Sequence, residues 1–136
     1  MKPTPFNVQE DLPPILFDKR HRHLAQSLKE AGLPWKPHVG CFVWDPEAHI
    51  EVSSPFPGQV YFILNLGHFL KIFGTPDRMV ESLVWLPTWH QARLLCSESG
   101  VAEQDVAAIW TGAASPSPGD EILALYALLL RHLKDK

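Results

Sequence analysis

The stretch VGCFVWDPEAHIEV, residues 39–52, decides the fold that we expect for this chain of 136 residues. A mostly apolar run leads up to Trp44, and the turn-forming residues Asp-Pro-Glu-Ala follow at 45–48. The next four residues, 49–52, alternate polar with apolar side chains. Alternation on both sides of a turn is typical of an antiparallel β-hairpin. We therefore predict a hairpin over residues 38–53.

The two faces of this predicted hairpin carry different side chains. If Trp44 lies opposite His49, one face is aliphatic and the other carries two aromatic rings. A strand pair with a single buried face normally has polar residues on its other face. We therefore expect another part of the chain, a second subunit or a small ligand to cover the aromatic face. That face consists of Phe42, Trp44, His49 and Glu51, and the aliphatic face of Cys41, Val43, Ile50 and Val52.

Helix-capping residues predict several helices on either side of the hairpin. Asp, Thr and Ser residues precede helix-like patterns, and Thr88 with Gln91 has the spacing of a capping box. The expected helices run from Asp18 to Gly32, from Thr75 to just before Pro87, from Thr88 to Gly100, from Ala102 to Trp110 with a stop at Gly112, and from Ser117 to Leu133 after a linker-like turn at 115–119.

The run from Gln59 to Phe73 has two interpretations. Residues 60–64 are apolar enough for a buried strand. As a helix, the same run places four polar side chains in one arc of about 120°, and we favour the helix because a strand leaves that spacing unexplained. The four are Tyr61, Asn65, His68 and Lys71.

The expected fold class is helix-rich α+β, with five or six helices packed on a small antiparallel β-hairpin and a third strand at 60–64 as the alternative. Four prolines within residues 1–16 prevent regular structure there, because proline lacks the backbone donor that helices and sheets need. We therefore expect an extended N-terminal arm over 1–16 and a single globular domain over 17–136.

Composition excludes several classes of protein. With 46% hydrophobic and 10% aromatic residues, the chain is too apolar for an intrinsically disordered protein. Its formal net charge of −3 argues against nucleic acid as a partner. We find neither a signal-peptide pattern nor an apolar run long enough to span a membrane, so we expect no membrane partner. The two cysteines are too far apart for a disulfide framework. These features favour a bacterial-type cytoplasmic protein.

Catalytic and metal-binding motifs are not apparent. The seven histidines form no HxxxH pair and no Cys/His spacing typical of zinc sites, so we predict no metal and no cofactor. We also find no nucleophile elbow and no glycine-rich phosphate loop. The weak enzyme candidate is the aromatic hairpin face, where His49 and Glu51 could act as acid and base beside an apolar wall.

A basic run opens the first predicted helix and suggests a second type of binding residue. Cations are disfavoured at a helix N-terminus, so a cluster there can serve an anionic ligand, although we favour the alternative of a solvated surface. The candidate ligand- or partner-binding residues are Phe42, Trp44 and His38 on the hairpin and Lys19, Arg20 and Arg22 on the helix.

The last predicted helix is apolar around most of its circumference, with leucines at 123, 125, 128, 129 and 130. Such a helix lies either at the centre of a core or in an interface. We therefore carry two hypotheses. The first is a non-enzymatic binding or assembly module that forms homo-oligomers or docks on a protein partner. The second is an enzyme or binding protein for a small anionic ligand that uses His49 and Glu51.

Overall fold

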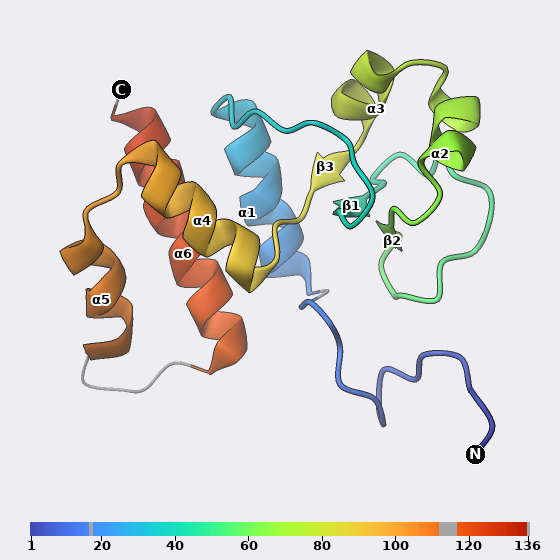
Figure 1. Ribbon diagram of the computed structural model, residues 1–136, viewed down its shortest axis with the longest axis horizontal. Helices are drawn as coiled ribbons and strands as arrows, with labels where there is room; N and C mark the ends of the chain where they lie inside the picture. The colour runs from blue at the N-terminus through green and yellow to red at the C-terminus, as the bar shows by residue number, and fades with distance from the viewer. Residues whose placement is uncertain (17, 112–116, 136) are drawn as a thin grey trace. The chain divides into compact units, whose positions relative to one another are not determined.

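The computed structural model describes residues 1–16, 18–111 and 117–135. Within these ranges the chain has six helices and one antiparallel three-stranded sheet, so the predicted helix-rich α+β class is confirmed (Figure 1). None of the helices in the described ranges is long and apolar enough to cross a membrane.

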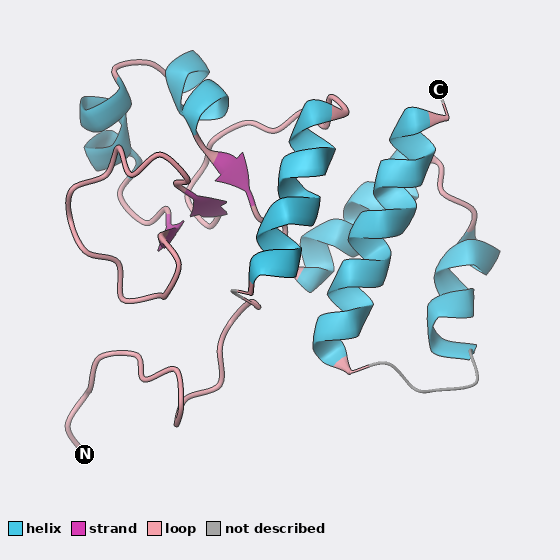
Figure 2. Cartoon of the chain, turned by 180° about the vertical axis from the view of Figure 1, so that it is seen from behind, coloured by secondary structure: helices cyan, strands magenta, loops and turns pink. Residues whose placement is uncertain are grey.

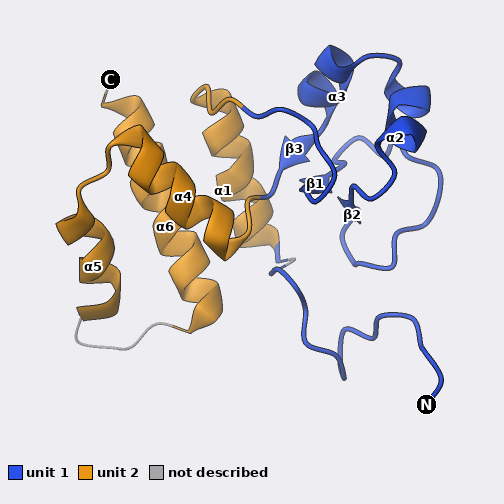
Figure 3. Ribbon diagram, in the orientation of Figure 1, with its two compact units in different colours: residues 1–18, 35–86 blue, residues 19–34, 87–136 orange. Residues whose placement is uncertain are grey.

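The chain divides into two units, which are coloured separately in Figure 3. Unit 1 comprises residues 1–18 and 35–86, and unit 2 comprises residues 19–34 and 87–136. Unit 1 contains the sheet with helices α2 and α3, and unit 2 contains the other four helices. The predicted division into an arm and a single domain stays a prediction.

The sheet of unit 1 has β1 (Phe42–Trp44) at its centre, between β2 (Val60–Phe62) and β3 (Val84–Trp85). Both neighbours run antiparallel to β1, and Trp44 lies opposite Val60 on one side and Val84 on the other. The predicted hairpin over 38–53 is therefore wrong: Trp44 does not face His49, and residues 49–52 form no strand.

Asp45 is the physical reason that the expected return strand does not form. Its buried carboxylate accepts hydrogen bonds from the backbone N–H groups of His49 (3.1 Å) and Ile50 (2.8 Å). These bonds use donors that a hairpin ladder would need, and Ala48 takes a positive φ of 55° to close the loop. Strands that are more distant in the sequence, β2 and β3, therefore pair with the two edges of β1.

The run from Gln59 to Phe73 contains a strand followed by a helix. The favoured interpretation as one helix is wrong for β2 and correct for α2 (Leu66–Phe73). Asn65 separates the two elements, because its side-chain oxygen accepts a hydrogen bond from the backbone of His68 (3.2 Å) and thereby caps α2. The alternative third strand is thus present over Val60–Phe62.

The core of unit 1 joins one face of the sheet to α2 and to α3 (Pro76–Ser82). Thr75 caps α3 as predicted, but the predicted end just before Pro87 is wrong, because the helix ends at Ser82 and the chain enters β3 at Val84. The buried residues of this core are Cys41, Val43, Ile50, Ile63, Phe69, Phe73, Met79 and Leu83. Residues 1–16 contain neither helix nor strand, and the ring of Phe6 packs against Phe56 at a centroid distance of 5.6 Å.

Unit 2 is built around α6 (Pro118–Lys134), which packs against α1 (Lys19–Glu30), α4 (Trp89–Ser99) and α5 (Glu103–Thr111). Figure 2 shows α6 between α1 and α5, with α4 behind it. One side of α6 is buried by these contacts, through Ile122, Leu125, Tyr126 and Leu129.

Local capping signals determine the helix ends of unit 2. The Thr88–Gln91 capping box is present at the start of α4, and Gly100 ends that helix with a left-handed φ of 87°. Ser117 caps α6 through a hydrogen bond from the backbone of Asp120 (3.3 Å). These predictions are confirmed. The predicted stop at Gly112 and the linker residues up to 116 lie outside the described residues.

Candidate functional site

The aromatic rings predicted on the outer face of the hairpin are covered within unit 1. Phe42 is only 7% exposed, because its ring lies 4.9 Å from that of Phe62 and 5.8 Å from that of Phe56, measured between centroids. Trp44 is half-buried. Phe42 and Trp44 thus pack largely in the interior of unit 1. They expose little surface through which they could bind a partner, so their predicted binding role stays a prediction.

The weak catalytic candidates do not form the expected pair. The Nε2 atom of His49 lies 3.0 Å from a carboxylate oxygen of Glu47, and its ring packs edge-on against Phe73. His49, Glu47 and Glu51 are all exposed, so solvent water weakens the electrostatic interactions among them. His38 is also exposed, with its Nδ1 atom 2.9 Å from the carbonyl oxygen of Val39.

Both cysteines are free, buried thiols. Burial raises the pKa of Cys41, against the opposing effect of a backbone hydrogen bond from His38. Burial likewise raises the pKa of Cys96 as the largest influence, with Arg93 lowering it and Glu103 raising it further. A thiol with a raised pKa is a poor nucleophile and a poor metal ligand at neutral pH. Within the described ranges, no three His, Cys, Asp or Glu side chains come together as a possible metal site.

The predicted basic residues at the start of α1 take different positions. Lys19 and Arg20 are exposed, and Arg22 is half-buried. His21, between them, is only 1% exposed, and its Nε2 atom lies 3.1 Å from the carbonyl oxygen of Gly119 at the start of α6. Since Nε2 faces a carbonyl, it carries the proton and donates that bond. The basic run is therefore partly structural.

The side of α6 opposite to its buried residues is the more exposed side of this helix. At about 100° per residue, Asp120, Ala124, Ala127 and Arg131 fall within about 60° of one another on that side. We call these four residues the α6 seam. Leu123 and Leu128 flank the seam, one on each side.

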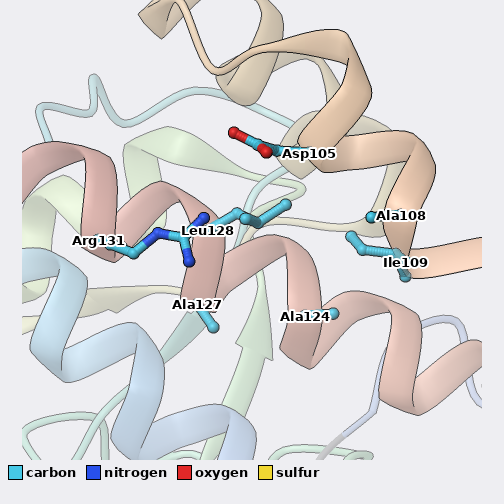
Figure 4. Close-up of a pocket in the computed structure, with 7 residues that line it drawn as sticks. All are labelled: Asp105, Ala108, Ile109, Ala124, Ala127, Leu128 and Arg131. Carbon is cyan, nitrogen blue, oxygen red and sulfur yellow. The ribbon is translucent and has the colours of Figure 1, made fainter. Parts of the chain in front are cut away.

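Two hollows lie along the α6 seam. One, of about 580 Å³, lies between α5 and α6, and Figure 4 shows Asp105 and Arg131 toward one end of it. The other, of about 590 Å³, lies between α1 and α6. Ala124 and Ala127 line both, so the two hollows are separated only by the small side chains of the seam.

Two of the basic side chains of α1 reach the second hollow. Arg20 and His23 line it together with Leu24 and Ser27, while Leu123 belongs to its α6 side. Of the six binding residues predicted from the sequence, Arg20 is the one that lines this surface. The two hollows form a shallow apolar trough along α6 with charged groups at its margins.

The α6 seam is held rigidly from behind. The hydroxyl of the fully buried Tyr126 donates a hydrogen bond to the carbonyl of Pro87, the residue before the α4 cap. Its ring packs edge-on against His21 at 6.4 Å. Because the buried side of α6 is anchored in this way, the seam residues keep a constant spacing on the open side.

Sequence reasoning did not identify the α6 seam. The leucine content of the helix predicted a place in a core or in an interface without indicating which side is open, whereas the seam consists of two alanines and two charges. The available signal was the 4-3-4 spacing of Asp120, Ala124, Ala127 and Arg131, which averages about 3.7 residues and so keeps these residues on one side of a helix.

Comparison with known proteins does not assign the chain to a family: no family model, no curated protein and no solved structure matches it.

Proposed function

We propose that the protein is a non-enzymatic assembly module that forms a homodimer through the α6 seam of unit 2. The observation that carries this proposal is the mirrored order of residue types along the open side of α6. Reading outward from the midpoint between residues 125 and 126, alanine meets alanine, leucine meets leucine, and aspartate meets arginine. The pairs are Ala124 with Ala127, Leu123 with Leu128, and Asp120 with Arg131.

A mirrored order of this kind suits a contact between two identical chains. In a two-fold symmetric contact, residue i touches residue j of the other chain, and j touches i. Two α6 helices that run antiparallel around the midpoint bring Ala124 onto Ala127 of the second copy. The same register brings Asp120 onto Arg131 of the second copy.

The side chains of the α6 seam fit close approach of two helices. Interaxial distances between packed helices run from about 8 to 10 Å, and small residues at the crossing favour the short end of this range. Ala124 and Ala127 stand at the crossing, and the adjoining hollows leave room for side chains of the second copy. Leu123 and Leu128 then become buried beside the seam.

Charge complementarity supports a second copy as the occupant. The antiparallel register forms two symmetric ion pairs between Asp120 and Arg131, one at each end of the contact. Each chain supplies its acid in the first turn of α6 and its base near the last turn, where the helix dipole also stabilises them. Electrostatic pairing of this kind selects the register and orientation more than it adds affinity.

The decisive experiment compares Ala127→Glu with Ala107→Glu by sedimentation equilibrium over a range of protein concentrations. Both alanines are exposed on helices of unit 2, and both changes add one negative charge, but Ala107 lines neither hollow. We expect a dimer for the original sequence and for Ala107→Glu, and at least tenfold weaker association for Ala127→Glu, because a buried, unpaired carboxylate costs more than about 1.4 kcal/mol. A monomer at every concentration of the unaltered protein excludes the homodimer.

Charge reversal tests the register itself. Asp120→Arg and Arg131→Glu each set like charges against each other twice in the dimer, and we expect each to weaken it about tenfold. The double variant restores both pairs with their order reversed and should recover most of the affinity. A double variant that is weaker than either single variant excludes the antiparallel register. Circular dichroism melting of each variant separates loss of association from loss of folding.

The cytoplasmic location belongs to the same proposal. Two cysteines that persist as buried thiols fit a reducing compartment.

A further inference from the structure

Unit 1 contains a hollow of about 320 Å³ that lies outside the α6 seam and shares Phe56 and Phe62 with the aromatic cluster around Phe42. It is bounded by the segment 50–56, by β2 and by the start of α2. Its lining is largely apolar and combines aliphatic side chains with aromatic rings. The aromatic lining residues are Phe56, Tyr61, Phe62 and Phe69.

Hydrogen bonds to the backbone hold one wall of this hollow. The Tyr61 hydroxyl donates to the carbonyl of Val52 (2.7 Å), and the Ser54 hydroxyl donates to the carbonyl of Val60. The backbone N–H of Phe56 in turn donates to the Ser54 hydroxyl (3.1 Å). The segment is thus fixed on both sides of Ser54, so the cavity exists before any ligand arrives, which lowers the entropic cost of binding.

The same hydrogen bonds determine the chemistry of the hollow. Because the hydroxyls of Tyr61 and Ser54 are used to hold the wall, they add little polarity to the interior. Burial of the Tyr61 hydroxyl and the nearby charge of Asp45 raise its pKa, so it stays protonated at neutral pH. The imidazole of His68 lies at the margin, edge-on to the ring of Phe69 at 6.2 Å, and is the only basic side chain among the lining residues.

Apolar side chains are exposed around the mouth of the hollow. Val52 is 60% exposed, Leu64 73% and Phe62 37%, and all three are lining residues. Clustered exposed apolar groups beside a cavity often mark a ligand-binding site. His68 is the third residue of α2, a helix with no acidic residue in its first turn. The partial positive charge of that helix end adds to the imidazole in favouring an anion there.

We propose that this hollow binds a small aromatic carboxylate. The ring enters between Phe56, Phe62 and Phe69, where edge-to-face contacts are available. The carboxylate stays at the mouth and accepts a hydrogen bond from the imidazole of His68. A volume near the lower end of the roughly 300–1,000 Å³ range of ligand pockets restricts the ligand to about one ring. No step of covalent chemistry is involved.

Benzoate and its neutral isostere benzamide are suitable probes, each titrated into the full chain labelled with ¹⁵N. We expect saturable shifts of backbone amides in the segment 50–56 and in 61–69, with a dissociation constant for benzoate on the order of 1 mM, as befits a ligand of about nine heavy atoms. Benzamide should bind several-fold more weakly, because a hydrogen bond to a charged acceptor is stronger than one to a neutral acceptor. Absence of saturable shifts with both probes at about tenfold higher concentration overturns the proposal.

Matched variants test the position of each group. Ser53→Trp places a large ring at the lining, whereas Ser97→Trp makes the same change at an exposed serine of α4. The first should abolish benzoate binding and the second should leave it unchanged. His68→Gln should weaken benzoate about fivefold and benzamide by less than about twofold, with His90→Gln as its control on an exposed histidine.

Two further outcomes would overturn parts of the proposal. Binding that survives Ser53→Trp places the probes elsewhere and overturns the site. Equal losses for benzoate and benzamide in His68→Gln overturn the role of the imidazole. The lining residues of the hollow lie in unit 1 and all seam residues lie in unit 2, so different variants test the two proposals and one proposal can fail without the other.

Discussion

In unit 2, α4 and α6 begin at side-chain caps that lie within three residues of the backbone groups they bind. In unit 1, the chain turns where side chains reach backbone groups four to eleven residues away, as Asp45 and Tyr61 do. Both units bury apolar cores and both contain capped helices, but the loops of unit 1 that surround the sheet are held by bonds from Asp45 and Tyr61 to the backbone. We therefore expect the helices of unit 2 to tolerate the loss of one cap, and unit 1 to depend more strongly on individual side chains such as Asp45.

Asp45→Ala should have the largest effect, because it leaves the backbone N–H groups of His49 and Ile50, the first part-buried and the second buried, without their acceptor. Unsatisfied buried donors cost about 1–3 kcal/mol each, so we expect a loss of about 3 kcal/mol in unit 1. Amide hydrogen exchange, compared between the two units, measures this loss. Equal loss of protection in α4 and α6 would show that the two units unfold together, and unchanged exchange in unit 1 would refute the role of Asp45.

Phe56→Ala should destabilise unit 1 by about 2 kcal/mol. The half-buried ring contacts both Phe6 and Phe42, so its removal opens a gap beside β1 and frees the N-terminal segment. Faster cleavage of residues 1–16 by a protease, relative to the unaltered chain, tests this contact. Phe56→Leu serves as the control that keeps most of the volume, and it should cleave at nearly the original rate.

Tyr126→Phe should cost unit 2 about 1.5 kcal/mol near neutral pH, because the carbonyl of Pro87 loses its buried donor. The substitution also changes the response to alkaline pH. Complete burial raises the pKa of Tyr126 well above its ordinary value of 10.0, so the folded chain keeps a proton that the unfolded chain loses. Stability therefore falls as pH rises above about 10, by up to about 1.4 kcal/mol per pH unit for this one group.

Urea unfolding at pH 8 and at pH 11 measures both effects of Tyr126→Phe. The variant should be the less stable chain at pH 8, and the difference should shrink or reverse at pH 11. A constant difference between the two pH values would contradict the burial of an ionisable hydroxyl.

Thr88→Ala should have the smallest effect, about 1 kcal/mol, because it removes one half of the α4 capping box. The change should raise hydrogen exchange in the first turn of α4 and leave the sheet of unit 1 unaffected. Thr88→Ser keeps the hydroxyl and should restore protection. A loss as large as that of Asp45→Ala would remove the contrast between the two units.

The fate of two expectations shows why the sequence predicts unit 2 better than unit 1. Helix starts at Thr88 and Ser117 follow from side chains and backbone groups that are neighbours in sequence, so spacing alone predicts them. The partner of β1 depends on which distant strand pairs with it, and Asp45 binds the backbone of His49 and Ile50, where the expected return strand would begin. The alternation in that segment was real, but alternation does not specify pairing.

The binding residues, too, were only partly predictable from the sequence. The charges and leucines of α6 were visible in the sequence, but which side of the helix is open follows from contacts with α1, α4 and α5. The hollow of unit 1 combines segments from 50–56, β2 and α2, and no spacing rule connects them. Phe42 and Trp44 were recognised as needing cover, and only the folded chain identifies Phe56 and Phe62 as what covers Phe42.

The sequence by itself determined the helix-rich α+β class, the caps of α3, α4 and α6, and the mirrored order of residues along α6. All of these are encoded over short distances, where backbone geometry relates spacing directly to position. Tertiary structure alone decided the order of the strands, the burial of Asp45 and His21, the hollow beside His68 and the open side of α6. Those features depend on which distant groups satisfy one another once water is excluded, and that competition is settled by the whole fold.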